Sequence, residues 1–347
     1  MRVTGKGIVL KLGRMALRAM PAPVRYRVAS VLERLRYRKV TEVHELPGIF
    51  HYWSNKYLRP VFERYHFTDP ENFFLVMCLQ QLQTRSGTAR LISIGSGNCD
   101  VEAKLARALV DSGVDDFELH CLDFNQAMLD RGAEHAAQLG VSEKLNWVRQ
   151  DFNDWKPEGQ FDVVLANQSL HHVVNLEGLF DAVYASLRED GLFLINDMIG
   201  RNGHQRWPEA LQAMLPLWNR LPERYHYNNQ SKQLESQYVD RDYSTHGFEG
   251  VRAQDILPLL VDRFAFHTFL PFGNVVFPFI DRAFGGNFDA ESVSDQAFID
   301  EVHAIDEAGF KAGKLTPNLM IAAVGKGQYE TRLREPYLTP QACIRRP

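Results

Sequence analysis

The segment Leu91–Glu102, LISIGSGNCDVE, is the feature that most restricts how this chain folds. Its first four residues are mostly apolar and suit a buried strand, and Gly95-Ser96-Gly97 then lead into a segment that favours a helix. Glycines in such a turn adopt dihedrals that other residues avoid, and they leave no side chain between the backbone and a ligand. A strand, a glycine turn and a helix N-terminus predict a site for a nucleotide-like ligand. The alternative is that the glycines only let the helix pack tightly on a sheet.

Strands and helices alternate after this turn. We expect strands at 91–94, 118–122, 145–149, 161–167 and 192–196, and helices at 100–112, 126–139 and 176–188. The alternation predicts an α/β fold with a Rossmann-like, doubly wound parallel sheet. Ligands of such sheets bind at the carboxyl ends of the strands. Polar residues stand at the predicted ends, namely Asp123, Asp151, Asn167 and Asp197.

The chain divides into three predicted parts. We expect an N-terminal basic and aromatic helical extension over 1–87, a main domain over 88–327 and a loose, polar tail over 328–347. The main domain contains two insertions, 199–250 and 271–317, which are rich in Trp, Tyr and Phe. Their composition suits a helical cap over an organic substrate, and it equally suits a small core of their own.

Charge is distributed unevenly along the 347 residues, whose net charge is −4. Residues 1–40 hold eleven Lys and Arg against one acid, so the remainder carries −14. This acidic remainder argues against a nucleic-acid substrate, because phosphate contacts need basic residues around the site. Residues 24–39 predict a basic amphipathic helix. That helix either exposes a solvated face or contacts a membrane surface or an anionic partner.

Residue spacing and the length of apolar runs indicate the metal content and the cellular compartment. Four cysteines show no metal-type spacing, and no group of histidines and acids shows one either, so we expect no metal site. Lys6 and Lys11 interrupt what would be a signal-peptide core, and no apolar run reaches membrane-spanning length. We therefore expect a cytoplasmic protein. The oligomeric state cannot be inferred from these patterns.

Four segments taken in order identify a resemblance: LISIGSG, HCLDFN, VRQDFND and FDVVLANQSLHHV. Together they resemble the class I S-adenosylmethionine-dependent methyltransferase family, over about residues 88–200. The resemblance implies an enzyme that uses S-adenosyl-L-methionine, and a seven-stranded sheet whose last pair, near 264–269 and 319–325, is antiparallel. An NAD-type fingerprint would place a third glycine where this chain has Asp100, which disfavours an NAD-dependent oxidoreductase.

The resemblance also implies roles for individual residues. The cofactor-binding set is Gly95 and Gly97 under the methionine and ribose, Asp123 at the ribose hydroxyls, Phe124 and Met128 beside the adenine, Asp151 and Phe152 at its amino group and face, and Asn167 and Gln168 at the sulfonium end. The family usually has an acid two positions before the first glycine, where this chain has Ser93. A hydroxyl there can orient the loop but offers no charge to the donor's ammonium, so backbone carbonyls or Asp100 would share that role.

Catalysis of methyl transfer needs mainly alignment, because the methyl group is already activated. A hydroxyl acceptor would also need a base, for which we name His172, His246 and His171, with His204 in the first insertion as a further candidate. We expect O-methylation of a small or medium organic acceptor, such as a natural-product, sugar or lipid-linked intermediate. The alternative from another class is a methyltransferase-fold scaffold that binds a partner without catalysis.

Overall fold

The computed structural model describes residues 46–83, 85–246 and 248–345, and the side chain of His246 is not among the described atoms. The basic helix predicted over 24–39 lies outside these residues. Within the described part of the chain, no helix combines the length and the apolar content needed to cross a bilayer.

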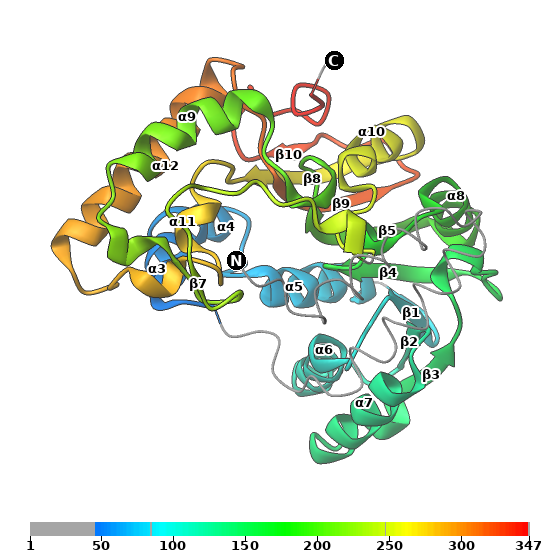
Figure 1. Ribbon diagram of the computed structural model, residues 1–347. Helices are drawn as coiled ribbons and strands as arrows, with labels where there is room; N and C mark the ends of the chain where they lie inside the picture. Colours follow the sequence, from blue (N-terminus) through cyan, green and yellow to red (C-terminus); the bar gives the residue numbers. More distant parts are fainter. Residues whose placement is uncertain (1–45, 84, 247, 346–347) are drawn as a thin grey trace, which may run out of the picture.

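An eight-stranded sheet forms the centre of the molecule, in the order β10-β8-β9-β5-β4-β1-β2-β3 (Figure 1). Its strands are β1 (Ala89–Ile94), β2 (Phe117–Asp123), β3 (Leu145–Arg149), β4 (Phe161–Asn167), β5 (Leu187–Met198), β8 (Ala265–Phe272), β9 (Leu319–Gly325) and β10 (Arg332–Leu333). Strand β9 runs antiparallel to both of its neighbours, and the other pairings are parallel. The predicted doubly wound sheet with a closing antiparallel pair is therefore confirmed. The count of seven strands omitted β10, which pairs through only two residues.

Helices cover both faces of this sheet (Figure 1). They are α5 (Pro70–Leu82), α6 (Asp100–Asp111), α7 (Gln126–Gln138), α8 (Leu176–Ser186) and α10 (Ala253–Arg263). Strand order turns back between β3 and β4, so right-handed crossovers place α6 and α7 on one face and α8 on the other. Parallel strands buried on both faces read as continuous apolar runs, and Leu91, Ile92 and Ile94 of β1 are accordingly all buried.

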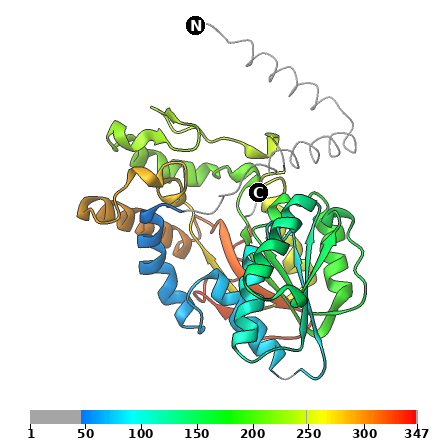
Figure 2. The same cartoon turned by 90° about the horizontal axis from the view of Figure 1, so that it is seen from below.

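The N-terminal helix α3 (Gly48–Trp53) packs beside α12 (Val293–Lys311), and α4 (Arg59–Glu63) follows it along the chain (Figure 2). Asp300 on α12 accepts hydrogen bonds from the hydroxyls of Tyr52 at 2.9 Å and Tyr57 at 2.7 Å. The aromatic residues of this N-terminal segment thus hold two distant parts of the chain together.

The segment after Gly327 is packed, although we expected a loose tail. Strand β10 adds to the edge of β8, and Leu338 and Cys343 are buried. Arg334 also donates from Nη1 to the carbonyl of Pro271 at 3.2 Å. Polar composition suggested solvent exposure, but a few apolar residues and one edge strand are enough to hold the segment against the sheet.

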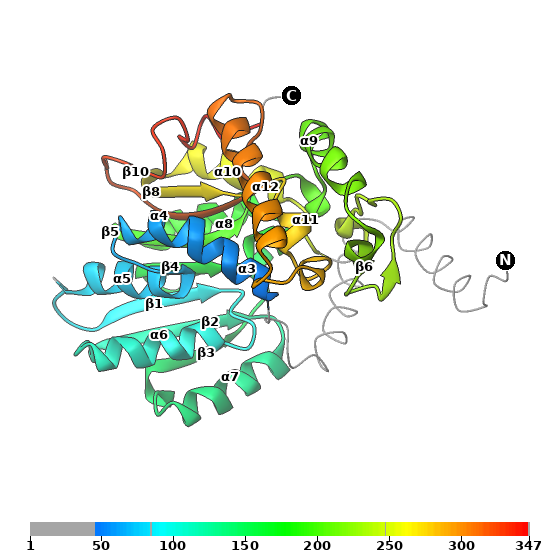
Figure 3. The same cartoon turned by 90° about the vertical axis from the view of Figure 1, so that its left-hand side faces the viewer.

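The two insertions form the cap, which lies beyond the carboxyl ends of the parallel strands (Figure 3). It contains α9 (Pro208–Asn219), α11 (Phe277–Ile280), α12 and a hairpin of β6 (Tyr227–Asn228) and β7 (Gln233–Leu234). Trp218 is fully buried there, stacked on His226 with ring centroids 4.4 Å apart and edge-on to Phe284. These cap aromatics therefore make a core of their own, which the aromatic composition allowed.

Candidate functional site

The glycine turn after β1 depends on its glycines for a physical reason. Gly95 and Gly97 have φ of +69° and +56°, the left-handed region that glycine adopts most easily. A Cβ on Gly95 would lie 2.8 Å from the Cβ of Ser169, closer than packed atoms allow. Cys99, which stands where many such loops have another glycine, also has a positive φ of 55°. The turn is thus held in a strained conformation by its surroundings.

Asp123 ends β2 and holds the glycine turn in place. Its carboxylate accepts from the backbone amide of Gly97 at 3.0 Å and from that of Asn125 at 2.7 Å. The side chain is only 4% exposed. Each carboxylate oxygen has two lone pairs and can accept more than one hydrogen bond.

Two phenylalanines lie next to each other close to the end of this strand. Phe124 and Phe152 meet nearly at right angles, with ring centroids 6.2 Å apart. Asp151 precedes Phe152 and accepts from the amide of Asn153 at 2.9 Å. Met128 lies close to the turn, since its Cε is 3.5 Å from where a Cβ on Gly97 would be. The structure therefore gathers the residues expected beside the adenine at one end of the sheet.

Ser93 has an acidic partner that the sequence did not indicate. Its hydroxyl donates to Oε1 of Glu102 at 2.6 Å, and Glu102 comes from the first turn of α6. Both side chains are buried. Burial raises the pKa of Glu102 to about 7, although the hydrogen bond from Ser93 acts in the opposite direction. The sequence predicted that backbone carbonyls or Asp100 would share the role of the missing acid, and the structure brings a further acid, Glu102, to Ser93.

The end of β4 joins the glycine turn to a group of histidines. Gln168 has a positive φ of 52° and donates its amide to the carbonyl of Asn196 at 2.8 Å, while Asn167 accepts from the Asn196 side chain. Ser169 then donates from its hydroxyl to the carbonyl of Ile94, the residue before Gly95, at 2.7 Å. One serine thus links the predicted cofactor turn to the segment that carries His171 and His172.

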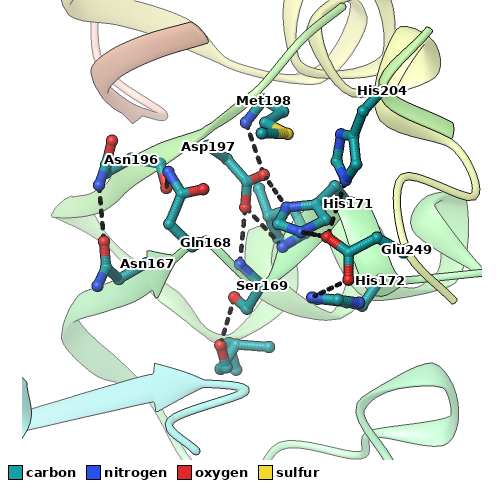
Figure 4. Close-up of polar contacts among 12 residues, drawn as sticks. Asn167, Gln168, Ser169, His171, His172, Asn196, Asp197, Met198, His204 and Glu249 are labelled. Atoms are coloured by element: carbon teal, nitrogen blue, oxygen red, sulfur yellow. Dashed lines mark hydrogen bonds and ion pairs between the residues drawn. The ribbon is translucent and has the colours of Figure 1, made fainter. Parts of the chain in front are cut away.

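The histidine cluster consists of His171, His172, His204 and Glu249 (Figure 4). Glu249 Oε1 lies 2.8 Å from His204 Nε2 and 3.5 Å from His171 Nε2, and its Oε2 lies 4.0 Å from His172 Nε2. The rings of His171 and His172 are also close, with centroids 4.1 Å apart. Residues far apart in sequence thus meet around one carboxylate.

Asp197, at the end of β5, fixes the orientation of His171. Its Oδ1 is 2.7 Å from His171 Nδ1, and its Oδ2 accepts from the amides of Ser169 at 2.8 Å and Leu170 at 2.7 Å (Figure 4). The amide of Met198 donates to Oδ1 as well, at 2.7 Å. Asp197 is fully buried, so four donors satisfy a charge that water cannot reach.

Backbone contacts hold the loops of the cluster together. The amide of Gly203 donates to the carbonyl of Gly250 at 2.8 Å, and the amide of Val251 donates to the carbonyl of His171 at 3.0 Å. His204 has a positive φ of 58°, which is uncommon for a residue with a side chain. These contacts set His204 and Glu249 beside His171 before any substrate binds.

Charges in the cluster follow from these contacts. Burial alone lowers the pKa of His171, but Asp197 and Glu249 outweigh it and raise the pKa to about 10. Burial and the adjacent His171 lower the pKa of His172 to about 4. Burial opposes the charge of Glu249, yet hydrogen bonds from His171 and His204 hold its pKa far below the ordinary value. Near neutral pH, His171 is a cation, Glu249 an anion and His172 neutral.

The same atoms are the set that could hold a metal ion. His171, His204 and Glu249 bring three ligand atoms within 4.8 Å of one another, the one such group found among the described residues. Sequence spacing did not reveal it, because the three lie on separate loops. Hydrogen bonds already join these atoms to one another, so the arrangement is satisfied without an ion.

The candidate base His246 is placed only by its backbone, in a short turn at Tyr243–His246. Glu249 and Glu102 were not among the residues that we named from the sequence. Both are acids whose partners lie on other elements, and a single sequence carries no signal of such pairing. The strand-end rule did single out Asp197, although it assigned no task to it.

Comparison with known proteins finds a matching family for the central part of the chain. A family described as "Methyltransferase domain" matches residues 92–193. Malonyl-[acyl-carrier protein] O-methyltransferase 2 of Ilyobacter polytropus is 24% identical over 126 residues, 36% of this chain and 45% of that protein. Sterol 24-C-methyltransferase erg6 of Aspergillus fumigatus is 33% identical over 73 residues, 21% of this chain and 19% of that protein. The chain thus spans less than half the length of these relatives.

Among solved structures, the chain is similar to an O-methyltransferase from a trans-AT PKS multienzyme of Brevibacillus brevis, in complex with S-adenosyl-L-homocysteine. The two are 14% identical, the match covers 88% of each chain, and the TM-score is 0.44. The matched family covers the glycine turn, Asp123, Asp151 and the histidine pair. Residues 92–193 thus match a methyltransferase-domain family, and this part of the chain is similar to S-adenosylmethionine-dependent methyltransferases.

Proposed function

We propose that this protein transfers a methyl group from S-adenosyl-L-methionine to a hydroxyl of a small or medium organic acceptor. The observation that carries the proposal is the contact of Ser169 with Ile94, which sets the histidine cluster directly beside the glycine turn. A methyl donor held by the turn and a proton acceptor in the cluster would therefore face the same space. Relatives named for an acyl-carrier substrate and for sterols support an organic acceptor.

The residues around the turn fit the donor. Its amino acid end would lie over Gly95 and Gly97, and a Cβ on Gly95 would already collide with Ser169. Asp123 would accept from the ribose hydroxyls, and Phe124 and Phe152 would lie beside the adenine. When bound, the cofactor supplies an electrophilic methyl group on sulfur. The chain's own task is then to orient the acceptor in line and to remove its proton.

His204 is the group that we assign to the proton. Because Glu249 is ionised, its carboxylate accepts the hydrogen bond from His204 Nε2. Neutral His204 therefore carries its hydrogen on Nε2 and has a lone pair on Nδ1. When the acceptor oxygen gains the methyl group, its proton would pass to Nδ1 of His204, and sulfur would keep the electron pair of the bond that breaks. Glu249 stabilises the imidazolium that forms, as the carboxylate of a catalytic triad does.

His171 and His172 have different roles in this proposal. Both ring nitrogens of His171 face carboxylates, so its positive charge keeps Glu249 ionised and in position. His172 is neutral, and its buried Nδ1 has no hydrogen-bond partner among the described residues. It is therefore the second candidate for the base. His246 stays a third candidate from the sequence.

The acceptor is best found directly. Cell extracts incubated with the protein and methyl-labelled S-adenosylmethionine, then analysed by mass spectrometry, should show one product heavier by one labelled methyl. Protein in which Gly97 is replaced by Val serves as the control, because its turn has no room for a ligand. No labelled product, with the cofactor bound normally, would favour the non-catalytic scaffold.

Single replacements then identify the base. His204→Ala should lower turnover by roughly 100- to 10,000-fold while leaving cofactor affinity unchanged, and added imidazole should restore part of the rate. His51→Ala, on an exposed histidine, is the matched control. If His204→Ala keeps the wild-type rate and His172→Ala loses it, the base is His172. If both variants keep the rate, His246→Ala is tested next, and if that variant also keeps the rate, the acceptor has no proton to lose, as in a carboxylate.

A further inference from the structure

Glu102 is a buried acid beneath the glycine turn that the proposed chemistry leaves without a task. It is 4% exposed, and the hydroxyl of Ser93 donates to it at 2.6 Å. Ser93 lies two residues before Gly95, and Glu102 lies in the first turn of the helix that follows Gly97. The acid is therefore joined to both sides of the turn.

The groups around Glu102 do not neutralise it. Asp100 on the same helix and Asp123 on β2 both act on it as like charges, Ser93 donates a hydrogen bond to it, and Glu102 in turn raises the pKa of the Cys121 thiol. Within residues 46–83, 85–246 and 248–345, no basic side chain forms an ion pair with Glu102. A buried carboxylate without a cation is strongly disfavoured. Accordingly, burial raises the pKa of Glu102 to about 7.

A bound methyl donor would bring the missing charge, because it carries a sulfonium and an ammonium against a single carboxylate. We propose that Glu102 is the acid that recognises this cationic donor, supplying from α6 the charge that Ser93 does not supply from β1. The inference rests on the proposed function. The demethylated product has a neutral thioether, so its net charge is lower by one. Glu102 therefore favours the donor over the product, and the site discriminates by charge.

This role couples donor binding to a proton. Below pH 7 the acid is mostly protonated, so donor binding favours loss of the proton. Donor affinity should level off above pH 7, fall by up to about tenfold per pH unit just below pH 7, and level off again at lower pH, where only the weaker-binding protonated form remains. Titrations in two buffers with different ionisation heats should show nearly one proton released per donor at pH 6 and almost none at pH 8.

The test is calorimetric titration of the full chain with S-adenosylmethionine and with S-adenosylhomocysteine. Glu102→Gln keeps an oxygen for Ser93 but removes the charge. It should weaken donor binding about 10- to 100-fold at pH 8, weaken product binding less and abolish the proton release at pH 6. Glu134→Gln, on an exposed acid of α7, should change nothing. Ser93→Asp added to Glu102→Gln returns a charge to the same place and should restore donor affinity.

Each result has a distinct meaning. Wild-type preference for donor over product in Glu102→Gln, with a native melting curve, overturns the inference alone. Equal loss of both ligands that Ser93→Asp does not restore also overturns it, because the acid would then only support the turn. If wild-type protein binds neither ligand, the proposed function itself fails, and this inference fails with it.

Discussion

Replacing Asp197 by Asn tests how the site is held together. Two donors reach each oxygen of Asp197, so an amide leaves two of the four without an acceptor and turns its own N–H groups toward them. Losing bonds to a charged acceptor costs about 1.5–3 kcal/mol each, and breaking a buried ion pair costs about 3–5 kcal/mol. These terms overlap, so we expect a loss of about 4 kcal/mol. For a chain of 347 residues this lowers the melting temperature by about 6 °C.

The pH dependence of this loss has a definite sign. The pKa of His171 is raised to about 10 in the folded protein, against about 6.5 when unfolded. Its contribution to stability is thus complete below pH 6.5 and disappears as pH rises through 10. The difference between wild type and Asp197→Asn should therefore be largest near pH 6 and shrink toward pH 10. Urea unfolding at several pH values measures it, with Asp262→Asn on the exposed side of α10 as control. A loss under about 1 kcal/mol, or one that does not change with pH, would refute the reasoning.

Three further predictions concern the turn, the buried acid and metal. Gly95→Ala should unfold more easily and bind cofactor less well than Gly113→Ala. Both glycines have a positive φ, but a Cβ would collide only at Gly95, where it would meet Ser169. Calorimetry and melting curves compare the two variants, and equal behaviour would contradict the close approach of Ser169 to Gly95. Glu102→Gln should be more stable than wild type at pH 8, by on the order of 3 kcal/mol, and equally stable near pH 4. Because the carboxyl pKa is raised on folding, the wild-type protein loses stability as pH rises from 4.5 through 7. A variant with the wild-type melting temperature at pH 8 would show that the buried acid does not destabilise the fold. Treatment with EDTA should leave both the melting temperature and the methyl-transfer rate unchanged, because the histidine cluster is held by its own hydrogen bonds. If EDTA lowers either quantity and added zinc restores it, the cluster is a metal site.

The sequence was sufficient for the sheet because its information is local. Apolar runs of the right length, a glycine turn and polar strand ends recur in order, and each depends on neighbouring residues alone. Asp123 and Asn167 stand at the predicted strand ends for this reason. The same logic missed β10, whose two residues carry too little pattern to mark a strand.

The site was harder to predict because its contacts are long-range. Glu249 meets His171 across 78 positions and Glu102 meets Ser93 across 9, and neither acid differs in sequence from an exposed one. The protonation states of the histidines could not be predicted from the sequence either. Adjacent histidines gave no sign that one would be a cation and the other neutral, since the difference comes from Asp197 and Glu249 on other elements.

Binding of the cofactor's product form tests the central claim most directly. Calorimetric titration of wild-type protein with S-adenosylhomocysteine should show one site per chain, and the ligand should raise the melting temperature. Asp123→Ala, which removes the carboxylate expected at the ribose, should weaken binding at least tenfold. No heat and no protection from unfolding, or an Asp123→Ala variant that binds like wild type, would contradict the account.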